Sequence, residues 1–261
     1  MQGDAARAAA CAAAPGRAQS EDRFVLAAGG NLLAVIDGLG GHEGGALAAS
    51  LAAEAVQEVG DAAAHASTAF DAPSLMRTAF AAAEARISRH ARGQPAWRDM
   101  GVAMVMVCVR DAQLCVAHIG DARAYLGRGG RLLRLTDDHT GVGQLLRAGL
   151  IEEAAAGRHP ARQPLLRVVG NNKQALPPEF GQHVLQPQDV LLLCSDGVWA
   201  ALAPETMAAL LASATSAAAC ARALVQAARD AGGTDDACAV VGRLTAGAGA
   251  SLQEASDAAA A

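Results

Sequence analysis

The chain of 261 residues carries a formal net charge of -5 at pH 7, and 52% of its residues are hydrophobic. This length and composition suit one large domain or two small ones. The basic residues lack the clustering that nucleic-acid binding requires, and no apolar run approaches the ~18 residues that cross a bilayer. The N-terminus lacks the basic-then-apolar order of a signal peptide. We therefore expect a cytoplasmic protein that binds neither nucleic acid nor membrane, with a monomer as the default state.

The six cysteines indicate buried thiols rather than a metal centre. None forms a C-x-x-C pair, and several lie within apolar, strand-like runs. We expect reduced thiols, and neither a zinc site nor a disulfide framework. The six are Cys11, Cys108, Cys115, Cys194, Cys220 and Cys238.

The N-terminal half alternates between strand-like and helical patterns. Residues 5–14 are so rich in alanine that a short strand and a disordered start fit equally well. Apolar runs over 24–28 and 32–36 predict two strands joined by a glycine-rich hairpin. Apolar residues at helical spacing then predict one helix over about 47–60 and a second from a cap at Ser74 to about Arg92.

The C-terminal half begins as a meander of hairpins and ends with two helices between two strands. The meander predicts an antiparallel sheet, because no crossover helices separate its strands. Residues 137–188 read as irregular, with helical patches over 142–149 and 151–156. Residues 245–261 have no strong apolar pattern and are expected to be a disordered tail. The remaining predicted elements are strands 101–109, 113–119, 122–126, 131–135, 189–195 and 238–244, and helices 204–212 and 216–231 with Ser216 as a cap.

This order of elements predicts an α+β fold. Helices grouped in pairs between antiparallel runs favour layers over a doubly wound parallel sheet. Two antiparallel sheets that face each other, each with a helix pair on its outer face, would bury all of the apolar stripes. We therefore predict a four-layer αββα sandwich in one domain over residues 1–244.

Three carboxylates follow or precede strand-like runs beside glycine. Asp37 ends the run 32–36, Asp196 ends a second apolar run, and Asp235 lies just before the last strand. This recurrence suggests one shared site. With Asp22 added, the donors are oxygen only, which favours Mg²⁺ or Mn²⁺ over zinc. Arg17 adds a guanidinium, which can grip a phosphate with two parallel hydrogen bonds.

Seven stretches in a fixed order identify the chain as similar to a known family. It resembles a type 2C metal-dependent (PPM) serine/threonine protein phosphatase of the bacterial kind. Each stretch alone is weak, but their joint order and spacing over roughly residues 15–244 are specific. The stretches are R-A-Q-S-E-D (17–22), D-G-L-G-G-H-E-G-G (37–45), H-I-G-D-A-R-A-Y-L (118–126), L-T-D-D-H-T (135–140), L-L-R-V-V-G (165–170), L-L-L-C-S-D-G-V-W (191–199) and G-G-T-D-D (232–236).

The resemblance implies a pair of metal ions, Mn²⁺ or Mg²⁺. Asp37 would bridge them, helped by the Gly38 carbonyl. Asp196 and Asp235 would complete one ion, and Asp22 would act directly or through water. The reaction implied is hydrolysis of phosphoserine and phosphothreonine on proteins, by attack of a water that bridges the metals. Phosphorylated proteins would be the substrates, and a serine/threonine kinase would oppose the enzyme.

The resemblance also assigns residues around the metal pair. Asp121 matches a position that helps to hold a third, weaker metal. Glu21 would support the ligands from outside their coordination. Arg17 matches the phosphate-binding arginine, so Arg17 and Asp37 would be the catalytic residues. Residues 137–188 correspond to the family's flap, a substrate-selecting element.

Four departures from the family pattern leave every expected metal ligand in place. Ser20 replaces asparagine, and its hydroxyl can still hydrogen-bond locally. Residues 102–103 are Val-Ala where a hydroxyl pair is common, and Asp236 replaces asparagine and adds a negative charge beside Asp235. Leu39 stands where some eukaryotic members carry a histidine that is proposed to protonate the leaving group.

The alternative function is a non-catalytic regulator that keeps the fold and binds a phosphoprotein. Residues 102–103 and Asp236 are its support. A hydrolase with an aspartyl nucleophile fits poorly, because the one lysine lies in the irregular region. We predict structural roles for His42, His118 and His139, although a turn histidine such as His42 could also serve as a ligand or acid.

Overall fold

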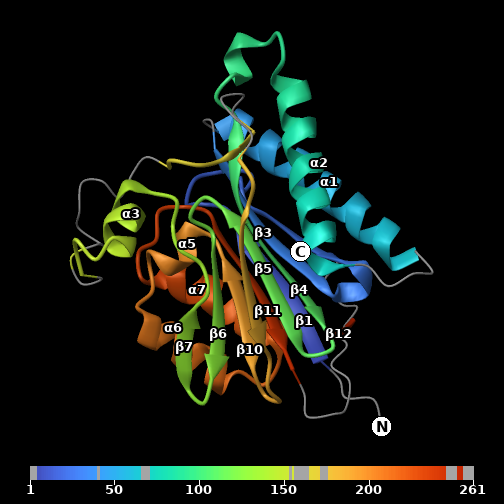
Figure 1. Cartoon of the computed structure of the whole chain (residues 1–261). Helices are drawn as coiled ribbons and strands as arrows, with labels where there is room; N and C mark the ends of the chain where they lie inside the picture. The colour runs from blue at the N-terminus through green and yellow to red at the C-terminus, as the bar shows by residue number, and fades with distance from the viewer. Residues whose placement is uncertain are drawn as a thin grey trace.

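Two facing β-sheets form the centre of the computed structural model, which describes residues 5–39, 42–65, 71–152, 155, 165–170, 176–244 and 252–254 (Figure 1). The sheet that contains β3, here the β3 sheet, has the order β2-β3-β4-β5-β9, with β8 paired to β4. Its strands are β2 (Arg23–Ala27), β3 (Leu32–Leu39), β4 (Gly101–Arg110), β5 (Gln113–Ile119), β8 (Val169–Gly170) and β9 (Glu179–Val184).

The second sheet, here the β11 sheet, has the order β12-β1-β11-β10-β6-β7. All its neighbours are antiparallel except β12, which runs parallel to β1 at the edge. Its strands are β1 (Ala5–Ala12), β6 (Arg123–Arg128), β7 (Arg131–Arg134), β10 (Val190–Cys194), β11 (Ala237–Arg243) and β12 (Leu252–Glu254).

Helices cover the outer face of each sheet, so the predicted four-layer α+β sandwich is confirmed. Helices α1 (His42–His65) and α2 (Ala72–Ala91) pack on the β3 sheet. Helices α5 (Asp196–Trp199), α6 (Pro204–Ser213) and α7 (Ala217–Asp230) pack on the β11 sheet. Further helical elements are the helix α3 (Gly141–Arg147) and the short 3₁₀ turns η1 (Ala28–Gly30) and η2 (Pro95–Trp97).

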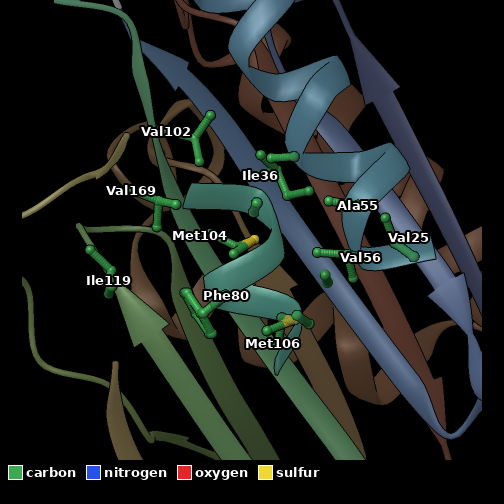
Figure 2. Close-up of a cluster of buried hydrophobic side chains, with 14 of the residues drawn as sticks. Val25, Ile36, Ala55, Val56, Phe80, Val102, Met104, Met106, Ile119 and Val169 are labelled. Carbon is green, nitrogen blue, oxygen red and sulfur yellow. The ribbon is translucent and has the colours of Figure 1, made fainter. Parts of the chain in front are cut away.

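Strand β4 shows why both faces of the β3 sheet are buried. Side chains alternate along a strand, and every residue of β4 but the last is buried. Met104 and Met106 face the helices, where they pack with Val56 and Phe80 (Figure 2). The intervening valines, such as Val105, face the β11 sheet and pack with residues of β10 and β11. The apolar interior thus lies in three layers.

Several boundaries differ from the prediction. The side chain of Asp71 caps α2 by accepting from the backbone N–H of Ser74 at 2.9 Å, so Ser74 lies inside the helix and is not its cap. Ser216 caps α7 as predicted. Strand β9 lies within the region read as irregular, because it is a half-exposed edge strand without apolar alternation. Half of the predicted helical patch 151–156 lies outside the described residues.

The two ends of the chain and the cysteines complete the comparison. Of residues 5–14, left open between strand and disorder, Ala5–Ala12 form β1. Cys11 and Cys238 are direct partners across β1 and β11 and form a disulfide, so the expectation of reduced thiols is wrong for this pair. The other four cysteines are free and buried. Within the expected tail, residues 252–254 form β12, while 245–251 and 255–261 lie outside the described residues. Every helix in the described part of the chain is too short or too polar to span a lipid bilayer.

Candidate active site

Asp37 and Gly38 lie inside β3, and not in a turn after it, since the strand continues to Leu39. Asp37 pairs with Ala103 of the neighbouring strand β4. A Cβ atom on Gly38 would lie 2.3 Å from the carbonyl oxygen of Gly45 and 2.8 Å from that of Glu21. Glycine is therefore required here, because the start of α1 and the loop before β2 both approach the strand at this point.

Asp22 lies next to Asp37 because of the strand register. Arg23, the first residue of β2, pairs with Ile36 of β3. Asp22, the residue before Arg23, therefore comes opposite Asp37, the residue after Ile36. The Asp22 carboxylate is buried and accepts a hydrogen bond of 2.6 Å from the Ser195 hydroxyl. Asp22 is thereby tied to the end of β10 in the other sheet.

Ser195 is a hydrogen-bonding partner of Asp22 that the sequence analysis missed. Its side chain is fully buried, and its hydroxyl also accepts from the backbone N–H of Cys238 at 2.9 Å. The backbone N–H of Ser195 donates to the Cys238 carbonyl at 3.1 Å. One hydroxyl thus joins Asp22 of the β3 sheet to β10 and β11. Its position next to Asp196 in the S-D-G stretch was the available signal.

Asp196 and Asp235 come together because β10 and β11 are antiparallel neighbours. Cys194 pairs with Ala239, so the residues after β10 and before β11 lie at the same end of the sheet. A Cβ atom on Gly197 would lie 1.9 Å from the carbonyl oxygen of Asp236, which shows how closely the two segments approach. A cavity of about 410 Å³ is lined by both Asp196 and Asp235.

Asp121 lies where the chain crosses from one sheet to the other, between β5 and β6. Because Arg123 of β6 pairs with Cys194 of β10, Asp121 comes close to the segment that carries Asp196. Its backbone carbonyl accepts from the indole N–H of Trp199 at 3.0 Å. Burial, followed by the charge of Asp196, raises the pKa of Asp121 to about 7.

The carboxylates act on one another electrostatically. Burial raises the pKa of Asp37 well above its ordinary value, and the charges of Asp22, Asp196, Asp121 and Asp235 raise it further. Burial likewise raises the pKa of Asp22, although the hydrogen bond from Ser195 opposes this rise. Such a cluster of acceptor-only oxygens fits hard divalent cations such as Mg²⁺ or Mn²⁺, which would relieve the repulsion.

Arg17 lies at the edge of this cluster and forms ion pairs with three acidic side chains through Nη1. Nη1 lies 3.2 Å from Asp236 Oδ2, 3.5 Å from Glu21 Oε2 and 3.8 Å from Asp235 Oδ1. Partial burial lowers the pKa of Arg17, but these three carboxylates outweigh that effect, so the guanidinium stays charged. A cavity of about 610 Å³, lined also by Arg23 and the first half of α1, opens beside Arg17.

Ser20 and Glu21 lie in supporting positions next to the carboxylates. Ser20 accepts from the backbone N–H of Asp22 at 3.0 Å, which is the local hydrogen bond expected of its hydroxyl. The side chain of His42 lies outside the described residues. Glu21 lies beside Gly45, where a Cβ on this glycine would be 3.0 Å from Glu21 Oε2.

His118, His139 and Glu179 form a second cluster, with one ligand-type atom of each within 4.8 Å of the others. His139 Nδ1 accepts from the backbone N–H of Gly120 at 3.0 Å, and His118 Nε2 lies 2.7 Å from the carbonyl of Asp137. The guanidinium of Arg167 already places a positive charge there, 3.0 Å from Glu179. Both histidines are buried and hydrogen-bonded, in agreement with their predicted structural roles.

The facing sheets, the outer helices and the carboxylates at the strand ends beside an arginine define a metal-dependent phosphatase. The family model described as protein phosphatase 2C matches residues 17–230. The chain therefore belongs to the protein phosphatase 2C family, and it is a protein serine/threonine phosphatase.

Known relatives support this placement over most of the chain. The protein phosphatase PhpP of Streptococcus pneumoniae is 35% identical over 180 residues, which are 68% of this chain and 71% of PhpP. The crystal structure of the serine/threonine phosphatase PstP/Ppp of Mycobacterium tuberculosis matches with a TM-score of 0.83 and 29% identity, over 92% of this chain and 99% of that chain. The catalytic domain of PstP in complex with two manganese ions matches with a TM-score of 0.81 and 27% identity, over 92% and 98% of the two chains.

Proposed function

We propose that this phosphatase hydrolyses phosphoserine and phosphothreonine with two divalent cations, Mn²⁺ or Mg²⁺, held between its two sheets. The convergence of carboxylates from both sheets carries this proposal: burial and the charges of the neighbouring carboxylates together raise the pKa of Asp37 and of Asp22. Folding such a cluster without a cation is electrostatically costly. The manganese pair in the related PstP structure agrees with the kind of ion proposed.

In this proposal Asp37 would hold both cations, helped by the Gly38 carbonyl, and Asp196 and Asp235 would complete one of them. Asp22 contacts the site directly or through a water, oriented by its hydrogen bond from Ser195. Bound cations would supply Lewis acidity and a water of lowered pKa for in-line attack on phosphorus. The partly buried position of Asp37 supports its role, because a low dielectric strengthens its interaction with a cation.

Asp121, Glu21 and Arg17 take the roles around the pair. Asp121 would help to hold a third, weaker cation, which its closeness to Asp196 supports. Glu21 would stabilise the arrangement from outside the coordination. Arg17 would bind the substrate phosphate, because its charge lies beside the carboxylates and the cavity next to it is open to a phosphorylated side chain.

The substrates would be phosphorylated proteins, and a serine/threonine kinase would be the opposing enzyme. Within one domain over residues 1–244, we propose that the flap, residues 137–188, selects among substrates. Its described parts are held together by ion pairs of Glu179 with Arg147 and Arg167. Such a supported loop can present a defined surface to a protein.

The test is a phosphopeptide assay with added Mn²⁺ on the wild type, Asp37→Asn, Asp235→Asn and the control Asp230→Asn. Asp230 ends α7 and hydrogen-bonds to Gln226 on the exposed surface. We expect the two site variants to lose at least about a hundredfold in kcat/KM, and the control to keep wild-type activity. Equal activity in all four proteins would contradict the proposed site.

The second candidate, a non-catalytic phosphoprotein-binding regulator, is favoured by Val102 and Ala103, which place apolar side chains beside the site. Calorimetry separates the two. The enzyme should bind at least two Mn²⁺ ions per chain, whereas a regulator should bind Mn²⁺ weakly or not at all.

A further inference from the structure

Asp236 is a buried carboxylate that has no place among the proposed metal ligands. It directly precedes β11, and only 2% of its surface is exposed. Its contacts lie more than two hundred positions away in the sequence, in the segment that leads from β1 to β2. That segment passes from the β11 sheet to the β3 sheet and carries Arg17.

Both oxygens of Asp236 accept hydrogen bonds from this segment. Oδ1 accepts from the backbone N–H of Ala14 at 2.5 Å. Oδ2 accepts from the backbone N–H of Glu21 at 2.5 Å and from Arg17 Nη1 at 3.2 Å. The backbone N–H of Arg17 in turn donates to the Ala14 carbonyl at 3.0 Å. Asp236 therefore holds the segment on both sides of Arg17 as well as its guanidinium.

The three donors explain why a carboxylate suits this position, where the family pattern has asparagine. A carboxylate is acceptor-only and can serve donors on both oxygens. An asparagine has one acceptor oxygen, and its amide nitrogen would face either Ala14 N–H or the donors of Glu21 and Arg17. At least one backbone N–H would then lose its partner at a buried position, which is costly.

The contacts also determine which part of the guanidinium is left for substrate. Nη1 faces Asp236 and donates the one hydrogen bond that the Arg17 side chain makes within the residues that the structure describes, which leaves Nε and Nη2 as donors without such a bond. Two parallel donors on one edge are what a phosphate binds best.

We infer that Asp236 is a positioning residue for substrate phosphate: it fixes Arg17 through Nη1 and through the segment on either side, so that the other edge of the guanidinium meets the phosphoryl group. The inference rests on the proposed function of Arg17. It assigns the extra carboxylate to phosphate binding, and not to a metal or to loss of catalysis.

The kinetic test compares Asp236→Asn with the wild type on a phosphopeptide at saturating Mn²⁺. We expect KM and the inhibition constant for inorganic phosphate to rise together, on the order of tenfold, with kcat changed by less than about threefold. A lower KM would overturn the inference, because it would mean that Asp236 competes with phosphate for Arg17. An unchanged KM would overturn it as well.

A matched control separates positioning from general loss of stability. Asp189 is equally buried, pairs with Arg128 through both oxygens and accepts from the backbone N–H of Gln186. It lies at the opposite end of β10 from Asp196. Asp189→Asn should destabilise the fold to a similar extent while leaving KM and phosphate inhibition as in the wild type. A rise of KM in both variants would assign the effect to stability and overturn the inference.

The coupling to Arg17 and a structural readout complete the test. In an Arg17→Ala background, Asp236→Asn should no longer change phosphate inhibition, and a full effect there would contradict the inference. Hydrogen exchange on the metal-free protein should show faster exchange of the Ala14 and Glu21 amides in Asp236→Asn, and unchanged protection of both would refute the hydrogen-bonding role. If the wild type has no phosphatase activity, the proposed function fails by itself, and calorimetric titration with inorganic phosphate still decides the role of Asp236.

Discussion

Replacing Ser195 with alanine tests whether the two sheets are tied together at the active site. The hydroxyl is fully buried, donates to Asp22 at 2.6 Å and accepts from the backbone N–H of Cys238 at 2.9 Å. Alanine removes both bonds and leaves the remaining contacts of a small side chain nearly intact. The substitution therefore isolates the polar link between the sheets.

The magnitude follows from the two partners that are left behind. The bond to the Asp22 carboxylate contributes about 1–2 kcal/mol, and the N–H of Cys238 loses its side-chain acceptor in a buried place at a further cost of about 1–2 kcal/mol. We expect the free energy of unfolding to fall by about 3 kcal/mol, a large part of the stability of a typical domain. The bond also lowers the pKa of Asp22, so its loss should make protons compete more strongly with Mn²⁺ at this carboxylate.

Urea unfolding with and without Mn²⁺ measures the first effect, and Mn²⁺ titration across pH measures the second. Ser213→Ala is the control, because its hydroxyl is exposed and makes one long bond of 3.5 Å to Leu210. The control should change stability by less than about 0.5 kcal/mol. If Ser195→Ala matched the control and bound Mn²⁺ with the wild-type pH dependence, the reasoning about the link would be wrong.

Three further predictions concern the carboxylates and the strand that carries one of them. Because the pKa of Asp37 in the folded protein is raised above its ordinary 3.8, the metal-free protein should lose stability as pH rises from 3.8 through the raised pKa. Asp37→Asn should therefore have a higher free energy of unfolding than the wild type at neutral pH in EDTA, and a lower one in excess Mn²⁺. Urea unfolding under both conditions measures this, and the same protein being the more stable one in both would contradict the prediction. Burial and the charge of Asp196 raise the pKa of Asp121 to about 7, so the affinity of a cation bound at Asp121 should fall below pH 7. Mn²⁺ titrations at pH 6 and pH 8 measure this difference, and equal affinities at the two pH values would contradict it. In Gly38→Ala the new Cβ would lie 2.3 Å from the Gly45 carbonyl oxygen, so urea unfolding should show a loss of stability of about 3 kcal/mol. A loss below about 1 kcal/mol would show that β3 and the start of α1 can move apart.

The strongly periodic elements could be predicted from the sequence because their local pattern matches their burial. Strand β4 is buried on both faces and reads as a continuous apolar run, and α7 has its predicted cap at Ser216. Strand β9 escaped prediction, because an edge strand with half-exposed residues has little apolar alternation to reveal it. The alanine-rich strand β1 stayed open for the opposite reason, since alanine fits helix, strand and coil without a distinguishing pattern.

The residues of the site could be predicted from the sequence, but the contacts between them could not. The ordered motifs named the carboxylates and Arg17, but the contacts that fix them join residues far apart in the chain. The hydrogen bond from Ser195 to Asp22 and those from the Arg17 segment to Asp236 join distant parts of the chain, so no short sequence pattern predicts them. The disulfide between Cys11 and Cys238 also depends on the register of β1 against β11, which alanines do not specify.

The placement of the site at the junction of two sheets has a thermodynamic consequence. Asp37 and Asp22 come from the β3 sheet, and Asp196 and Asp235 from the segments that flank β10 and β11, so cations held among them would join the two sheets. Binding to the folded state alone raises the free energy of unfolding by RT ln(1 + [L]/Kd), about 2.7 kcal/mol at a hundredfold excess over Kd. Because no single sheet carries all four carboxylates, this stabilisation should appear in the global unfolding transition and not in the local opening of one loop. Hydrogen exchange should then show added protection in core strands of both sheets when Mn²⁺ is present, and protection confined to the loops would mean that the cations bind to one sheet only.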